Sequence, residues 1–70
     1  MKTQQVCKDF LRLHKGSTFD AMEASWMMME HWGIKVDWHE MADALQYLLS
    51  SNEADHASKG FDRQQRYTIK

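Results

Sequence analysis

Cysteine and histidine are the residues of this chain best suited to metal binding or nucleophilic chemistry. They are Cys7, His14, His31, His39 and His56. A zinc site needs three or four ligands, usually with closely spaced pairs, and the intervals between these residues contain no such pair. The segment His39-Glu40-Met41-Ala42-Asp43 approaches the His-Glu-x-x-His zinc-binding pattern, but Asp43 stands where the second histidine is required. The sequence therefore predicts no metal site and no cofactor.

Cys7 also lacks the surroundings of a catalytic nucleophile. Nothing in the sequence places a histidine beside it, and no glycine-rich or basic context is present to activate the thiol. Its apolar neighbours indicate a buried, inert thiol, and a single cysteine excludes an intramolecular disulfide. A 70-residue chain also has little room for a core, a deep pocket and a catalytic constellation together. We therefore expect that the protein is not an enzyme.

The composition is that of a folded chain, with 43% hydrophobic and 11% aromatic residues. We expect residues 1–70 to form a single domain. No apolar run approaches the length of a membrane span, and the N-terminal residues lack the apolar region of a signal peptide. These features predict a cytoplasmic protein with no membrane partner.

Two amphipathic segments predict the first two helices. Residues 3–14 carry a stripe of Val6, Phe10 and Leu13, and Gly16 follows as a terminator. Residues 17–19 form a short connection that can supply one rung of a strand. The second helix begins with the capping box Asp20-Ala21-Met22-Glu23, ends at Gly33 and exposes Met27 on the face opposite its buried one. The side chains expected on that buried face are Met22, Trp26, Met29 and Trp32.

The rest of the chain predicts a third helix and a β-hairpin. Asp37-Trp38-His39-Glu40 is a second capping box, and Asn52 is placed to end the helix in the left-handed conformation. Its buried stripe is Met41, Ala44, Leu45, Leu48 and Leu49. After Asn52 the apolar period changes from helical to alternating, which predicts a two-stranded hairpin over residues 53–69. The predicted core comprises Phe10, Leu13, Met22, Met29, Trp32, Leu45, Leu48 and Ile69.

Three helices followed by a hairpin resemble the winged helix-turn-helix family. The resemblance is strongest after Gly33: Leu45-x-x-Leu48 leads into a turn at Asn52, and a glycine turn at Gly60 precedes the closing strand Arg66-Tyr67-Thr68-Ile69. It implies a mostly helical α+β fold. In that family the third helix enters the DNA major groove, and the hairpin, called the wing, contacts the backbone or the minor groove.

Carried over position by position, the resemblance implies a small DNA-binding transcription regulator or accessory factor whose partner is double-stranded DNA. Small regulators of this kind are typical of phages and mobile elements. The nucleic-acid-binding residues would be Lys35, His39, Gln46, Lys59, Arg63 and Arg66.

The distribution of charge modifies this expectation. The net charge is −1 overall. Residues 1–19 contain four basic residues against one acidic, a net +3; residues 20–53 contain one basic against seven acidic, a net −6; residues 54–70 contain four basic against two acidic, a net +2. Because phosphate neutralisation supplies most non-specific affinity for DNA, we expect the basic first helix and the wing to dominate DNA contact.

The acidic middle of the chain supports a second hypothesis, a protein-interaction module that binds a basic protein partner. Its acidic contacts would be Glu30, Glu40 and Asp43. Met27 and Trp38 would add exposed apolar contacts, which would also serve a homodimer. The sequence leaves both hypotheses open.

Overall fold

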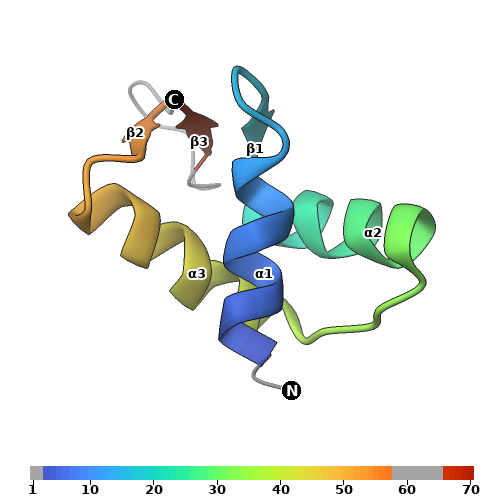
Figure 1. Cartoon of the computed structure of the whole chain (residues 1–70). Coiled ribbons are helices and arrows are strands. Elements are labelled where there is room, and N and C mark those ends of the chain that lie inside the picture. The colour runs from blue at the N-terminus through green and yellow to red at the C-terminus, as the bar shows by residue number, and fades with distance from the viewer. Residues whose placement is uncertain (1–2, 58–65) are drawn as a thin grey trace.

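The computed structural model describes residues 3–57 and 66–70 and contains three helices and one small sheet (Figure 1). The elements in chain order are α1 (Thr3–Arg12), β1 (Thr18–Phe19), α2 (Ala21–Trp32), α3 (Trp38–Ser50), β2 (Ala54–His56) and β3 (Tyr67–Ile69). β3 lies between β1 and β2 and pairs antiparallel with both. This element order is that of a winged helix, and the fold class predicted from the sequence is confirmed.

The predicted hairpin is present as the pair β2–β3, in which Ala54 lies opposite Ile69 and His56 opposite Tyr67. Its turn falls among residues 58–65, outside the described residues. The connection after α1 supplies the third strand, β1, and the Thr18 and Thr68 hydroxyls lie 2.9 Å apart across the β1–β3 pair.

Local signals in the sequence set the ends of the helices. The Asp20 side chain accepts a hydrogen bond from the Glu23 backbone N–H at 2.7 Å, as an N-cap does. Gly33 ends α2 with φ 66°, and Asn52 follows α3 with φ 66°, both in the left-handed region expected for helix C-termini. α1 ends at Arg12, two residues before the predicted end.

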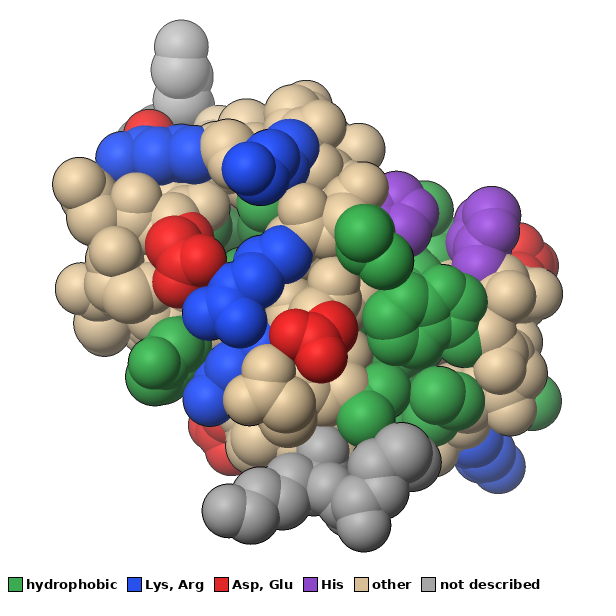
Figure 2. Space-filling model, viewed as in Figure 1, with side chains coloured by type: hydrophobic (Ala, Val, Ile, Leu, Met, Phe, Trp, Pro, Cys, Tyr) green, Lys and Arg blue, Asp and Glu red, His purple; other side chains and the backbone are tan. Residues whose placement is uncertain are grey.

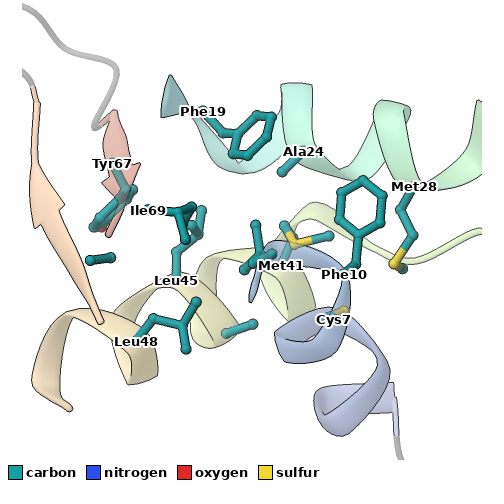
Figure 3. Close-up of a cluster of buried hydrophobic side chains, with 13 residues drawn as sticks. Cys7, Phe10, Phe19, Ala24, Met28, Met41, Leu45, Leu48, Tyr67 and Ile69 are labelled. Carbon is teal, nitrogen blue, oxygen red and sulfur yellow. The ribbon is translucent and has the colours of Figure 1, made fainter. Parts of the chain in front are cut away.

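The core lies where the three helices meet the sheet (Figure 3). Its buried hydrophobic side chains are Cys7, Phe10, Leu11, Phe19, Ala24, Met28, Met41, Ala44, Leu45, Leu48, Ala54, Tyr67 and Ile69. Of the predicted core, Phe10, Leu45, Leu48 and Ile69 are confirmed as buried. Leu49, also expected on the buried stripe of α3, is half-buried and packs against this core.

The predicted burial of Leu13 and of one face of α2 is wrong. The buried face of α1 consists of Cys7, Phe10 and Leu11, and Leu13, beyond the end of the helix, is 71% exposed. On α2 the buried residues are Ala24, Ser25 and Met28, so the helix is rotated from the predicted orientation. The small side chains at positions 24 and 25 let α2 approach its neighbours closely.

The rotation of α2 leaves most of its large apolar side chains on the surface. Met22 is 52% exposed, Met29 48% and Trp32 38%, although all three were predicted to be buried. Met27, predicted to be exposed, is half-buried and packs against the core. Apolar residues occur around most of the circumference of α2, so its periodicity could not select one face.

Candidate functional site

A basic band runs along the outer side of α1. We define this α1 band as Lys8 and Arg12, which lie one helical turn apart on α1, and Lys15 in the turn that follows the helix. Figure 2 shows blue side chains forming a diagonal band across this side of the molecule, with red side chains beside them. Lys8 Nζ lies 3.6 Å from the ring centroid of Tyr47, so the band adjoins the exposed side of α3.

The Arg12 guanidinium already forms a salt bridge within the protein. Its Nε and one terminal nitrogen donate to the two carboxylate oxygens of Glu53, at 2.9 and 3.1 Å. These hydrogen bonds, with one from Ser51 Oγ, lower the pKa of Glu53 to about 2 because they stabilise the carboxylate. The pair joins α1 to the segment after α3. Among the described residues Lys8 and Lys15 form no salt bridge, although the charge of Lys15 also contributes to lowering the pKa of Glu53.

Arg66, predicted to contact DNA from the wing, is held at the start of α2. Its guanidinium lies 3.7 Å from Asp20 Oδ2 and 3.2 Å from Glu23 Oε1, and it donates to the Thr18 carbonyl at 3.4 Å. A phosphate contact by Arg66 would have to replace these interactions. The other two predicted wing contacts, Lys59 and Arg63, lie outside the described residues.

The exposed side of α3 carries no lysine or arginine. His39 stacks on the Trp38 ring, with the ring centroids 3.8 Å apart. Gln46 is exposed, and its side-chain amide donates to the Tyr67 hydroxyl at 2.5 Å. Lys35, the remaining predicted DNA contact, is exposed in the loop before α3. His39 and Gln46 lie on α3 and Lys35 lies in the loop before it, so Lys35 is the one lysine or arginine that this part of the predicted DNA-contact set supplies.

The three acidic residues predicted to bind a protein partner do not form one continuous face, because Glu30 lies on α2 and Glu40 and Asp43 lie on α3. Glu40 is half-buried, and the Gln4 side chain donates to its carboxylate at 2.6 Å and to its backbone carbonyl at 2.9 Å. Asp43 and Glu30 are exposed on different helices. Glu40 is thus partly occupied in joining α1 to α3, and it does not stand free beside Asp43.

The structure also forms a groove that the sequence did not predict. We define the α2 groove by the side chains that line it: Met22, Ser25, Trp26, Met29, Lys35, Val36, Asp37 and Trp38. Its volume is about 840 Å³, and most of its lining is apolar. Three of these residues, Met22, Trp26 and Met29, had been assigned to the buried face of α2. The signal in the sequence is the excess of large apolar residues on α2 over what one helical face can bury.

The histidines and the cysteine form no reactive centre within the described part of the chain. Cys7 is buried, and burial, with a smaller contribution from the charge of Glu40, raises the pKa of its thiol. The His14 and His31 rings lie 6.0 Å apart between their centroids. Over residues 3–57 and 66–70, no three His, Cys, Asp or Glu side chains converge on a common point. The same residues contain no helix long and apolar enough to cross a membrane.

Comparison with known proteins identifies the fold. No protein-family model and no curated protein sequence matches the chain. A solved structure described as giving insights into the DNA recognition and protein interaction domains and the homologous DNA pairing properties of HOP2 is similar, with a TM-score of 0.67. The fold is that of a winged helix. The similarity covers 99% of this chain and 100% of the other, and at 13% sequence identity it concerns the fold alone.

Proposed function

We propose that this protein binds duplex DNA as a small regulator or accessory factor and has no catalytic activity. The single observation that carries the proposal is the α1 band, because two of its three cations, Lys8 and Lys15, form no salt bridge with a described residue. The winged-helix fold supports it, since the similar structure concerns DNA recognition in HOP2.

The contacts expected from this surface are mainly with phosphates. Lys15 is exposed in the turn after α1, and Lys8 is half-buried on α1 with its ammonium over the Tyr47 ring. Arg12 between them can share its guanidinium with a phosphate at the expense of Glu53. Asp43 would lie close to phosphates if α3 entered a major groove, and the repulsion would weaken that mode of docking. DNA binding led by α1 therefore carries little sequence discrimination, because phosphate contacts position a protein without reading bases.

Measuring affinity for a random-sequence duplex across a salt series tests the proposal. Each lysine that contacts a phosphate contributes about 0.9 to the slope of log K against log salt. Lys15→Ala should therefore reduce the slope by about one unit, whereas Lys35→Ala, which removes the same charge beside the start of α3, should leave it nearly unchanged. Asp43→Asn should raise affinity for all duplexes by removing repulsion.

Two results would contradict the proposal. Absence of binding at low salt would exclude DNA as the partner. A Lys35→Ala variant that loses as much slope as Lys15→Ala would show that α3, and not α1, leads the contact.

A second function, binding of a protein partner, is supported by a separate observation, the exposed α2 groove. Of the residues in the protein-interaction hypothesis, Trp38 and Glu30 remain candidate contacts for such a partner. Met27 is half-buried, so the exposed Trp26 takes its role as an apolar contact.

A further inference from the structure

The α2 groove exposes more large apolar surface than the fold needs. Trp26 is 69% exposed, Met22 52%, Met29 48% and Trp38 47%. Isolated apolar side chains are common on protein surfaces, but a contiguous group in a concave site marks a binding surface. Tryptophan is the residue most often found at the energetic centre of such interfaces, and methionine adapts its shape to different partners.

The charges beside the groove indicate what kind of partner fits it. Glu30 lies one turn after Trp26 on α2, and Asp37 lines the groove itself. Neither carboxylate forms an ion pair with a described residue, although Asp37 caps α3 by accepting from the His39 backbone N–H. Lys35 is the one basic side chain in the lining. Acidic groups at the rim therefore remain available to an incoming cation.

Several other carboxylates of the described residues already have a basic partner. Asp20 and Glu23 face Arg66, Glu53 faces Arg12, and Asp55 faces Lys70. The described carboxylates without an ion pair are Glu30, Asp37, Glu40 and Asp43. Of these four, Asp37 lines the groove and Glu30 directly follows the groove residue Met29, so half of them lie at the α2 groove.

We propose that the α2 groove binds a basic amphipathic helix of a partner protein. Apolar side chains of that helix, at positions i, i+3 or i+4 and i+7, would enter between Trp26, Met29 and Trp38. Lysine or arginine side chains flanking this stripe would meet Glu30 and Asp37. This arrangement combines an apolar anchor with a charged rim, which together set affinity and orientation.

A second copy of this chain fits the groove less well than such a helix. The basic helix of the protein is α1, and its apolar side is committed to the core, where Cys7, Phe10 and Leu11 are fully buried. A symmetric contact through the groove would bring the carboxylates Glu30 and Asp37 of both copies into one interface, against only one groove lysine, Lys35, from each copy. The described residues therefore supply no exposed basic amphipathic helix.

The experiment uses a synthetic helical peptide of about 18 residues with leucine at i, i+3, i+4 and i+7 and lysine on the other face. Two comparison peptides have glutamate in place of lysine, or the same composition in scrambled order. Titration into the full chain is followed by calorimetry and by tryptophan fluorescence. We expect saturable binding of the lysine peptide and at least about tenfold weaker binding of the other two.

Variants of the protein locate the site. Trp26→Ala should weaken binding by about 30-fold or more, the effect of removing a central anchor. Leu13→Ala is the matched control, because Leu13 is 71% exposed at the end of α1 and away from the groove, and it should keep the parent affinity. Glu30→Lys should weaken binding of the lysine peptide and strengthen binding of the glutamate peptide. This reciprocal change cannot arise from unfolding.

Several outcomes would overturn the proposal. They are equal binding of the scrambled peptide, no binding of the lysine peptide, and parent-like binding by Trp26→Ala. A dimer in sedimentation experiments that Trp26→Ala dissociates would assign the groove to a second copy instead. DNA affinity of Trp26→Ala is measured in parallel, because the α1 band and the α2 groove share no residue. Loss of peptide binding with retained DNA binding would separate this inference from the proposed function.

Discussion

Two leucines at the end of α1 provide a direct test of the fold, because they differ in burial but not in chemistry. Leu11 is fully buried, whereas Leu13, two residues later, is 71% exposed. Changing either leucine to alanine removes the same atoms. Leu11→Ala removes fully buried methyl groups and leaves a cavity in the core, and such changes cost about 2–5 kcal/mol. Leu13→Ala should change the free energy of unfolding by less than about 0.5 kcal/mol.

The cost of Leu11→Ala is large relative to the whole protein. At about 0.05–0.15 kcal/mol per residue, a chain of this size has a stability of only about 4–10 kcal/mol. A loss of about 3 kcal/mol should lower Tm by more than 10 °C, since each kcal/mol shifts the Tm of a small domain by about 4–8 °C. Thermal and urea unfolding followed by circular dichroism measures both variants. Equal destabilisation by the two substitutions would refute the orientation of α1 and the surface position of Leu13.

Two further predictions follow from the titrating groups. The pKa of Glu53 is lowered to about 2 from its usual 4.5, so its pair with Arg12 stabilises the fold fully above about pH 4.5, and this contribution is lost as the pH falls toward 2. Glu53→Gln should therefore make the free energy of unfolding fall less steeply between pH 5 and pH 2 than it does in the parent protein. An unchanged pH profile would show that the pair contributes nothing. The thiol of Cys7 is buried and its pKa is raised, so a thiol reagent at pH 8 should label the native protein far more slowly than the urea-unfolded chain, and equal rates would contradict its burial.

The helix boundaries could be predicted from the sequence because the interactions that set them are local. Asp20 caps a backbone N–H three residues away, and Gly33 and Asn52 adopt a backbone conformation that few other residues tolerate. Only part of each predicted capping box forms, however. The Glu23 carboxylate faces Arg66, and the Glu40 carboxylate accepts from Gln4, so partners distant in sequence displaced the local ones.

The roles of charged residues could not be read from local sequence. Arg12 and Glu53 are 41 positions apart, and Arg66 and Glu23 are 43 positions apart. No periodic pattern connects such residues, and each pair exists only because the helices and the sheet bring the two segments together. This is why Arg66 was predicted to contact phosphates but is held against the start of α2.

The sequence by itself determined the order of the elements, three helices and a closing hairpin. The signals that set this order act over only a few residues: the spacing of apolar side chains, the helix caps, and the residues that end helices in the left-handed conformation. It also determined the core stripe of α3, where Leu45 and Leu48 recur on one clear face. Tertiary structure alone decided which face of α2 is buried. Close packing selected the small side chains of Ala24 and Ser25 for the interior, and this choice left Trp26 on the surface.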